Sequence, residues 1–433
     1  MRIVQIAPGT GDSFYCENCL RDSVLARQMI KLGHDVMMVP MYLPVGIERQ
    51  ERVDEVPIFF GGINVYLQQK WGLFRHTPGW IDRMLDSKRL LNWAGRRVGM
   101  TSARQLGRTT VSMLRGEQGR QKKELHRLLQ WLSEQPDRPD VVCLSNVLLA
   151  GLVRGIKAEL GVGVVSLLQD EDTFLDGLAA PYSENAWEMV GELCSEIDGF
   201  VAVSRYFGKV MQKRLSISED RMHVVPPGVR LERYEPAGSA PRVPTVGYLS
   251  RMCPERGLDT LVEAFVMLKA KEGLKDARLR IAGGASVSDK RFVKQLREGL
   301  RGQGLLEDVE FLPDFDWPER GDFLRSLSVL CVPEKFPVAG GVYVLEAWAT
   351  GVPVVEPDMG VFSELVGGTG GGVLYEAGNS QALSESLGVL LGDPQRAAAM
   401  GQRGRDAVCK QYNVERSAEE MVQVFDMVAE RYR

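Results

Sequence analysis

Hydrophobic and polar residues are arranged along this chain in two alternating patterns. Short apolar runs rich in β-branched residues recur through its first half, among them RIVQIAP, DVMMVPMY, DVVCLS and GFVAVS. Between several of them lie segments with apolar residues at helical spacing, such as Leu20, Val24, Leu25, Met29 and Leu32. Strands that are apolar on both faces and alternate with helices are typical of a doubly wound parallel sheet. We therefore predict an α/β, Rossmann-like domain in the first half of the chain.

The same alternation begins again in the second half. Its apolar runs are PTVGYLSRM, ARLRIAGG, DVEFLPDF, SVLCVPE and GVPVVEPD, and the stretch from Pro226 to Pro244 before them is rich in proline and glycine, as linkers are. A chain of 433 residues also exceeds the size at which a single core keeps growing. We predict two Rossmann-like domains that face a deep cleft, at residues 1–240 and 241–412. A C-terminal helix at residues 413–433 is predicted to pack back on the first domain.

Composition narrows the class of protein. Hydrophobic residues make up 44% and charged residues 25% of the chain, as in soluble globular proteins, and the formal net charge of -4 gives no overall attraction to nucleic acid. Seven cysteines, an odd number and mostly scattered, fit reduced thiols better than a disulfide framework. The N-terminus lacks the apolar stretch of a signal peptide, and no apolar run is long enough to cross a bilayer. We expect a cytoplasmic protein that is soluble or at most peripheral at the inner face of the membrane.

Two arginines follow a predicted strand of the second domain. Arg251 and Arg256 lie between the strand GYLS and the helix LDTLVEAF, and Gly283 follows the strand LRIA. Open α/β sheets bind ligands beyond the carboxyl ends of their strands. A guanidinium can bind the oxygens of a diphosphate in bidentate fashion and keeps its charge. The pair is predicted to bind a diphosphate, with two solvated surface arginines as the alternative.

One ionisable residue interrupts the apolar segment GGVYVLEAWATGVPVV. Glu346 follows Gly340 and Gly341 in the early turns of a predicted helix, where the positive end of the helix favours a negative charge. A carboxylate in such a place can accept hydrogen bonds from a ribose, as acidic residues do in dinucleotide-binding folds. The alternative is a helix-capping carboxylate. With the ribose role, Glu346→Gln is expected to weaken nucleotide binding with little loss of fold.

Together, these segments resemble the retaining glycosyltransferases of family 4, which have the GT-B fold. GYLSRMCPERGLDTLVEAF, RIAGG, VYVLEAWATGVPVVEPDMGVFSELV and GGVLYEAGNSQALSESL cover the second domain in the family's order, whereas matches in the first domain, such as LGHDVMMV and GFVAVSRYFGKVM, are thinner. The resemblance implies transfer of a hexose-type sugar from a nucleotide-diphosphate donor to a glycan, lipid or small-molecule acceptor, with retention of configuration. It also implies no metal and no other cofactor, with the donor on the second domain and the acceptor on the first.

The resemblance also implies roles for individual residues. Arg251 matches the family's diphosphate-binding arginine and Arg256 stands where the family usually has lysine, so both are implied to act on the leaving diphosphate during catalysis. Glu346 matches the second glutamate of the E-x7-E motif, which holds the nucleotide ribose. Gly360 and Glu364 match the GG-x-x-E stretch. The remaining positions implied in donor binding are Gly11, Gly283, Gly340 and Gly341.

Several positions depart from the family's pattern. Eight residues before Glu346 the motif has a glutamate near the donor sugar, whereas this chain has Val338, and the nearest acid upstream is Glu334. The family's histidine and aspartate after a strand of the first domain correspond to Gln169 and Asp170, so Asp170 is predicted to lie near the sugar or the acceptor as a third catalytic residue. These changes leave two other functions open: a catalytically impaired nucleotide-sugar-binding protein and a sugar-nucleotide epimerase on the same fold.

Two short motifs leave alternatives. Cys16 and Cys19 form a C-x-x-C pair at the start of the first helix, which fits the lining of a pocket better than a redox or metal site because no second pair with zinc spacing accompanies it. The acids Asp170, Glu171 and Asp172 have the spacing of the metal-binding D-x-D motif of the single-domain GT-A fold. A loop cluster of acids is the better interpretation, since the second domain matches GT-B throughout.

A basic segment extends the first domain. Residues from about 70 to 138 contain about fifteen lysines and arginines against about six acids, and they hold four of the seven tryptophans. A helical insertion of this kind can rest on an anionic membrane, and a helical subdomain over the acceptor site is the alternative. We expect no nucleic-acid partner because no recognition module accompanies the charge. The four tryptophans are Trp71, Trp80, Trp93 and Trp131.

Overall fold

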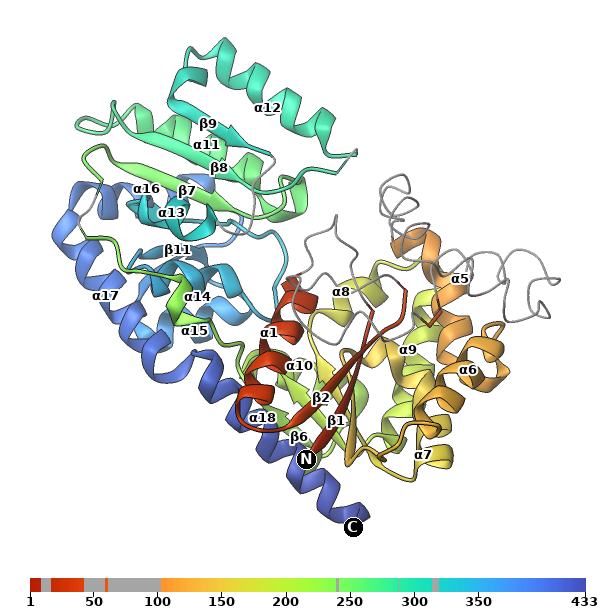
Figure 1. The fold of residues 1–433 in the computed structure, drawn as a ribbon. Helices are drawn as coiled ribbons and strands as arrows, with labels where there is room; N and C mark the ends of the chain where they lie inside the picture. Colours follow the sequence, from red (N-terminus) through yellow and green to blue (C-terminus); the bar gives the residue numbers. More distant parts are fainter. Residues whose placement is uncertain (9–16, 43–58, 61–102, 239–240, 287, 314–318) are drawn as a thin grey trace. The chain divides into compact units, whose positions relative to one another are not determined.

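The computed structural model describes residues 1–8, 17–42, 59–60, 103–238, 241–286, 288–313 and 319–433. It contains two compact units, unit 1 with Met1–Pro226 and Ser417–Arg433 and unit 2 with Pro227–Arg416. Each unit has a six-stranded parallel sheet with helices, which confirms the predicted α/β class with two Rossmann-like domains (Figure 1). The division falls after Pro226 rather than near residue 240, because Val229 and Tyr234 belong to the core of unit 2.

The sheet of unit 1 has the strand order β2-β1-β3-β4-β5-β6. The chain places β2 on one side of β1 and then returns to the other side for β3, so the strand order reverses between β1 and β3. All of these pairs are parallel, and the central strands are buried along their length, as apolar runs without alternation predict. The strands are β1 (Arg2–Ala7), β2 (Asp35–Pro40), β3 (Val141–Leu144), β4 (Gly163–Leu168), β5 (Gly199–Ala202) and β6 (Met222–Val224).

Helices alternate with the strands of unit 1, and no helix among the described residues of the chain is long and apolar enough to cross a membrane. They are α1 (Glu17–Lys31), α5 (Ala103–Leu114), α6 (Lys122–Ser133), α7 (Val153–Leu160), α8 (Glu171–Asp176), α9 (Tyr182–Leu193) and α10 (Arg205–Leu215), with short 3-10 helices η3 (Gly116–Gln118), η4 (Val147–Leu152), η5 (Cys194–Glu196) and η6 (Glu219–Arg221).

The C-terminal helix completes the core of unit 1. Helix α18 (Val414–Ala429) places Phe425 and Val428 in one apolar cluster with Ile3 and Val165 of the sheet. Gly163 begins β4 beneath this helix, and a Cβ at that position would overlap Val428. The residues from Ser417 onward therefore belong to unit 1 although they follow unit 2 along the chain.

The sheet of unit 2 has the strand order β12-β11-β10-β7-β8-β9, and all of its pairs are parallel. The chain builds outward from β7 through β8 to β9 and then returns to the other side of β7 for β10. The strand order therefore reverses between β7 and β10. The strands are β7 (Thr245–Leu249), β8 (Arg278–Ala282), β9 (Val309–Leu312), β10 (Val329–Leu330), β11 (Val354–Pro357) and β12 (Gly372–Tyr375).

The helices of unit 2 follow the same alternation, and two of them, α16 and α17, come after the last strand. They are α11 (Leu258–Lys269), α12 (Lys290–Gly302), α13 (Arg320–Arg325), α14 (Val342–Ala349), α15 (Val361–Thr369), α16 (Ser380–Gly392) and α17 (Pro394–Gln411), with the 3-10 helices η7 (Leu231–Arg233), η8 (Pro254–Arg256) and η9 (Leu306–Asp308); η11 (Glu430–Tyr432) ends the chain in unit 1.

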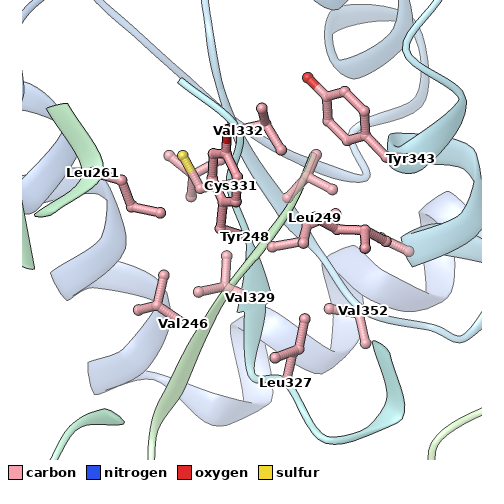
Figure 2. Close-up of a cluster of buried hydrophobic side chains, with 14 of the residues drawn as sticks. Val246, Tyr248, Leu249, Leu261, Leu327, Val329, Cys331, Val332, Tyr343 and Val352 are labelled. Atoms are coloured by element: carbon pink, nitrogen blue, oxygen red, sulfur yellow. The ribbon is translucent and has the colours of Figure 1, made fainter. Parts of the chain in front are cut away.

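The core of unit 2 is one apolar cluster that includes residues of β7, β10 and the surrounding helices (Figure 2). Val246 and Tyr248 of β7 lie near Val329 of β10 in this cluster. On α14, the fully buried Trp348 donates from Nε1 to the carbonyl of Gly371 at 2.9 Å. Its ring lies directly against Gly404 of α17, where a Cβ would overlap the indole. Close packing of α14 on α17 thus depends on a glycine inside a helix.

We expect Gly404→Ala to destabilise the protein by about 1–3 kcal/mol, because the added methyl group overpacks the site of Trp348. Gly299→Ala in α12 is the matched control, since a Cβ there meets nothing within 4 Å. That change should be neutral or stabilising by up to about 1 kcal/mol, as alanine is the better helix former. Urea denaturation of both variants measures the difference, and equal effects would contradict the packing argument.

Candidate functional site

The strand-order reversal of unit 2 is the place where an open parallel sheet usually binds its ligand. The connections from the two strands at a reversal leave in opposite directions, so the carboxyl ends of these strands stay accessible. In unit 2 these strands are β7 and β10. Arg251 and Arg256 follow β7, and Glu334 follows β10. Both predicted arginines therefore lie at this end of the sheet, together with an acid.

Arg251 is held by a carboxylate that the sequence analysis did not identify. Its Nε and Nη2 atoms donate to the two oxygens of Asp289 at 2.8 and 3.1 Å, and Nη2 also donates to Ser286 Oγ at 3.3 Å. Burial by itself would raise the pKa of Asp289, but the hydrogen bonds from Arg251 and Ser286 outweigh it and lower that pKa. The Arg251 side chain is 38% exposed and that of Asp289 7%. The buried acid is thus ionised and orients a guanidinium whose remaining surface faces solvent.

Arg256 is oriented in the same way by Glu334. Its Nη1 donates to Oε1 of Glu334 at 2.5 Å, and the glutamate side chain is 2% exposed. Gly257, with a φ of 65°, permits this contact, because a Cβ there would overlap the carbonyl oxygen of Pro333. The backbone N–H of Lys335 donates to the carbonyl of Glu255 at 3.1 Å and joins the same two loops. The loops after β7 and β10 are therefore fastened together where the ion pair forms.

The glycines predicted to bind the donor lie at strand ends and helix starts of unit 2. Gly283, with a φ of 137°, follows β8 so close to the Ser250 carbonyl that a Cβ would overlap it. Backbones of the loops after β7 and β8 thus approach each other only because residue 283 is glycine. The other predicted positions lie where α14 and α15 begin, and they are Gly340, Gly341, Gly360 and Glu364.

The loop between β10 and α14 contains both Val338 and Glu334. The Val338 side chain packs against the core of unit 2, and its carbonyl accepts the N–H of Val361 at 3.1 Å. Gly360 lies so close that a Cβ there would come within 2.8 Å of the Val338 nitrogen. Glu334 begins the same loop and lies on Arg256 instead. The chain therefore carries an acid at the carboxyl end of β10 although its spacing departs from E-x7-E.

Glu346 belongs to a buried ion pair. Arg320, the first residue of α13, donates from Nη2 to Glu346 Oε2, and the hydroxyl of Tyr234 donates to Oε1 at 2.8 Å. Burial raises the pKa of Glu346, whereas Arg320 and Tyr234 act to lower it. The residue is 2% exposed and lies beyond the first turn of α14, so it is not a helix-capping carboxylate. Its partners in this structure are protein side chains, and its ribose role stays a prediction.

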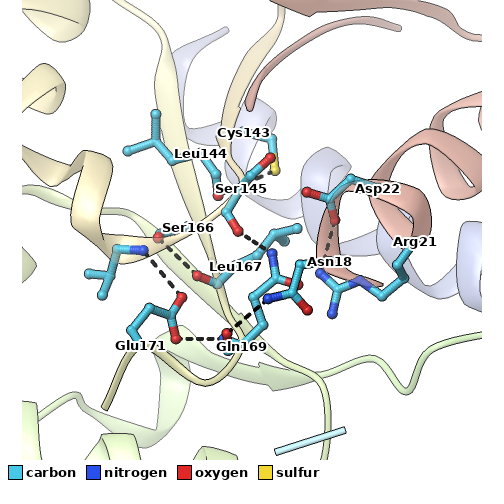
Figure 3. A network of polar contacts seen from close by, with 11 residues as sticks. Asn18, Arg21, Asp22, Cys143, Leu144, Ser145, Ser166, Leu167, Gln169 and Glu171 are labelled. Carbon is cyan, nitrogen blue, oxygen red and sulfur yellow. Dashed lines mark hydrogen bonds and ion pairs between the residues drawn. The ribbon is translucent and has the colours of Figure 1, made fainter. Parts of the chain in front are cut away.

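Unit 1 has a polar network at its own strand-order reversal (Figure 3). Gln169, after β4, donates from its amide to the carbonyl of Ser145, after β3, and the Gln169 carbonyl accepts a hydrogen bond from Asn18 of α1 at 3.3 Å. Asp22 of α1 is 1% exposed, pairs with Arg21 at 3.0 Å, and has its pKa raised by burial. Within the described residues, Asp22 Oδ2, Ser145 Oγ and Gln169 Oε1 are buried without a well-formed hydrogen bond, although Ser145 and Gln169 lie close enough to Asp22 to act against the rise of its pKa. Polar atoms in this situation are costly to bury, and a polar ligand is one way to satisfy them.

The acids that follow β4 divide between a structural and an exposed position. Glu171 is buried and accepts the N–H groups of Gln169 at 2.6 Å and Val147 at 3.4 Å, which ties the ends of β4 and β3 together. Burial raises the pKa of Glu171 to about 8. Asp170 precedes it with a φ of 65° and is partly exposed at the start of α8. The structure thus places the predicted Asp170 beside the polar network of unit 1.

Some predicted positions lie outside the described residues, and the predictions for them stay open. They include Gly11, Cys16 and three of the four tryptophans of the basic segment, and the side chain of Cys19 is not described either. The described part of the basic segment forms α5, η3 and α6. Its tryptophan, Trp131, is half-buried with its ring centroid 5.4 Å from that of Phe59. This tryptophan therefore contributes to internal packing of unit 1.

Solved structures share this fold over nearly the whole chain. Sucrose-phosphate synthase from Thermosynechococcus elongatus matches with a TM-score of 0.72 at 16% sequence identity, with 99% of each chain covered. HepE from Anabaena, in complex with UDP, matches with a TM-score of 0.68 at 15% identity, over 99% of this chain and 100% of that one. Units 1 and 2 therefore correspond to the two domains of the GT-B fold.

Sequence profiles assign the family. The profile described as Glycosyltransferase Family 4 matches residues 96–233, and that described as Glycosyl transferases group 1 matches residues 232–407. The two matches follow each other without a gap through both units. The chain therefore belongs to the family-4 glycosyltransferases with the GT-B fold, which confirms the resemblance found in its sequence.

Curated relatives are similar over part of their length. D-inositol 3-phosphate glycosyltransferase of Nocardia farcinica is 32% identical over 222 residues, which is 49% of this chain and 49% of that protein. The GDP-mannose-dependent alpha-(1-6)-phosphatidylinositol monomannoside mannosyltransferase of Mycolicibacterium smegmatis is 30% identical over 241 residues, 52% of this chain and 60% of that protein. The chain thus spans about half the length of the curated relatives it matches.

The buried ion pair corrects the expectation that Glu346→Gln would leave the fold nearly intact. The neutral amide leaves the buried charge of Arg320 without its carboxylate, and breaking a buried pair costs about 3–5 kcal/mol. We expect a loss of that order in the free energy of unfolding, measured by urea denaturation. Glu298→Gln removes a carboxylate that is 55% exposed and should change stability by less than about 0.5 kcal/mol. Equal stability of the two variants would exclude a structural role for Glu346.

Glu171 predicts a pH dependence of stability in unit 1. Folding raises the pKa of the Glu171 carboxyl from its ordinary 4.5 to about 8, so its contribution to stability is fully present below pH 4.5 and is lost as the pH rises through 8. Glu171→Gln keeps an oxygen for the Gln169 N–H and removes the titration. Between pH 5.5 and 7.5 we expect the unfolding free energy of the wild type to fall by about 2 kcal/mol relative to Glu171→Gln. Parallel curves for the two proteins would contradict the assignment.

Proposed function

We propose that this protein transfers a hexose-type sugar from a nucleotide-diphosphate donor to an acceptor with retention of configuration, without a metal ion or other cofactor. The observation that carries the proposal is the pair of arginines at the strand-order reversal of unit 2. Arg251 and Arg256 are each oriented by a buried carboxylate and each remain 38% exposed. Two fixed guanidinium groups at this end of a parallel sheet are suited to a diphosphate.

The chemistry follows from where negative charge develops. When the bond between the sugar and the diphosphate breaks, charge accumulates on the leaving phosphate oxygens. Cationic donors that are already in place stabilise this charge without further reorganisation, and such electrostatic terms usually dominate catalysis. Retaining transfer of this kind needs no separate protein base when the leaving phosphate assists the attacking hydroxyl. Asp289 and Glu334 then act as positioning residues, because their carboxylates hold the guanidinium groups of Arg251 and Arg256 in place by hydrogen bonds.

We place the donor on unit 2 and the acceptor on unit 1. Unit 2 offers exposed guanidinium groups and the predicted glycines at strand ends, which suit an anionic donor. The edge of unit 1 instead has buried acceptor atoms to which no described residue donates a well-formed hydrogen bond, among them Asp22 Oδ2 and Gln169 Oε1. Hydroxyl groups of a sugar or polyol would supply the donors that these oxygens lack. The names of the curated relatives, which refer to inositol phosphate and phosphatidylinositol mannoside, support an acceptor rich in hydroxyl groups.

Val338 favours one alternative function, a nucleotide-sugar-binding protein that transfers nothing. Its side chain packs on the core where the motif has an acid. Glu334 supports the active alternative, because it supplies a carboxylate to the same strand end and contacts Arg256. A hydrolysis or transfer assay with several sugar nucleotides separates the two functions, since binding without turnover for every donor would favour the inactive protein. Nothing described in either unit specifically favours an epimerase.

We expect the wild type to bind UDP or GDP in titration calorimetry, and Arg256→Gln to weaken that binding at least about tenfold by removing a charge-assisted hydrogen bond. Arg256→Lys should retain most of the affinity, because it keeps the charge beside Glu334. Arg301→Gln is the control, since it removes an exposed arginine from the last turn of α12, at the other end of that helix from Asp289. Thermal unfolding checks that each variant is folded. Undiminished binding by Arg256→Gln would contradict the diphosphate role.

A further inference from the structure

A basic pocket lies in the helical part of unit 1. It has a volume of about 330 Å³, at the lower end of the range for small-molecule sites. Its described lining includes Arg108, Arg115 and Arg120, together with Gln118, Tyr182 and Asn185, and contains no acid among the residues that the structure describes. Helix α5, helix α9 and the segment around η3 supply these residues. None of them belongs to the set predicted for the donor or to the network around Gln169.

The helices place these side chains on one side of α5. Arg108, Val111, Ser112 and Arg115 all line the pocket. Val111 and Ser112 lie three and four residues after Arg108, and Arg115 lies four and three residues after them, as positions on one helix face do. Helix α9 can lie close to this face because residue 107 is glycine, where a Cβ would clash with the side chain of Tyr182. Two walls of the pocket are therefore the faces of packed helices.

The third wall is a loop with a fixed course. Ser112 Oγ accepts the backbone N–H of Arg120 at 2.9 Å and donates to Gln121 Oε1 at 2.7 Å, and both of these side chains are buried. Gly116 and Gly151 meet backbone to backbone, since a Cβ on Gly116 would overlap the Gly151 carbonyl. The loop that carries Gln118 and Arg120 is thus anchored to α5 and η4. The pocket is part of the packed structure of unit 1.

Several polar groups in the pocket are available to a ligand. Among the described residues, the guanidinium of Arg115, the side-chain amides of Gln118 and Asn185, and the hydroxyl of Tyr182 make no hydrogen bond or ion pair. These groups supply many donors and few acceptors. They face a lining with three positive charges on a chain whose formal net charge is -4. The donors around Arg115 that have no partner among the described residues therefore favour an anion with several acceptor oxygens.

We propose that this pocket binds a phosphate monoester or diester carried by the acceptor. A phosphate group has several oxygens and accepts bidentate hydrogen bonds from guanidinium groups, whereas a carboxylate would match one arginine. The pocket's binding of phosphate goes beyond sugar transfer, and only its assignment to the acceptor rests on the proposed function. The phosphate can belong to a soluble phosphorylated compound or to a lipid headgroup, and both share this chemistry.

The test uses the full chain and Arg115→Gln, because the Arg115 side chain is exposed and makes no hydrogen bond or ion pair within the described residues. Binding of glycerol 3-phosphate is measured by calorimetry, with glycerol as the uncharged control. Sedimentation with phosphatidylcholine vesicles, with and without phosphatidylinositol, gives the lipid arm. Arg291→Gln is the matched charge control. Arg256→Gln distinguishes phosphate bound in the pocket of unit 1 from phosphate bound at the strand reversal of unit 2. UDP binding is measured on every variant.

We expect Arg115→Gln to weaken binding of glycerol 3-phosphate at least about tenfold, while Arg291→Gln changes it less than twofold and UDP affinity stays the same. Loss of vesicle binding alone would instead assign the phosphate to a lipid headgroup. Both results support the pocket. Unchanged binding of both probes by Arg115→Gln overturns it. A protein that binds phosphate through Arg115 but no UDP or GDP would refute the proposed function and leave the pocket standing.

Discussion

The reversal of strand order between β7 and β10 is the constraint on which the candidate site of unit 2 depends. Because the strand order reverses there, the loops after β7 and β10 are neighbours at one edge of the sheet. Gly257 lets the two backbones approach closely, and the ion pair between Arg256 and Glu334 joins the loops. Arg251 is fixed beside them by Asp289. Topology, backbone contact and charge pairing therefore act on the same few residues, and the cationic groups are in position before any ligand arrives.

Buried acids in the two units meet different surroundings. At the strand-order reversal of unit 2, Asp289 and Glu334 each contact an arginine, so their negative charge is compensated and the guanidinium groups are held in place. At the edge of unit 1, Asp22 pairs with Arg21 and Glu171 accepts backbone N–H groups, while Asp22 Oδ2 and Gln169 Oε1 receive no well-formed hydrogen bond from the described residues. The edge of unit 2 thus presents guanidinium groups, whereas the edge of unit 1 has buried acceptor oxygens to which the described residues donate no well-formed hydrogen bond. This division matches a reaction in which an anionic donor and a hydroxyl-bearing acceptor bind to different units.

The alternation of apolar strands and helices was sufficient to predict both sheets and the positions of Arg251, Arg256 and Gly283 at strand ends, because each of these follows from local sequence. The partners of Arg251 and Glu346 could not be predicted, since Asp289 is brought to the first and Arg320 and Tyr234 to the second by the tertiary fold. The solitary acid in an apolar helix did indicate that a partner for Glu346 must exist. The E-x7-E spacing placed the motif's first acid at residue 338, which is a valine. The acid of this loop is Glu334, and its contact with Arg256 could be seen only in the folded loop.

Helix α18 has a consequence for the order in which the units form during synthesis. Phe425 and Val428 lie in the core of unit 1 with Ile3, yet all of unit 2 is translated between these segments. All residues of the second sheet are therefore synthesised before helix α18, which completes the core of unit 1. Unit 2 can fold while the chain is still attached to the ribosome, whereas part of the apolar core of unit 1 stays uncovered until residue 428 has been made. During synthesis, unit 1 thus exposes apolar surface for longer than unit 2 and is the part of the chain expected to need a chaperone.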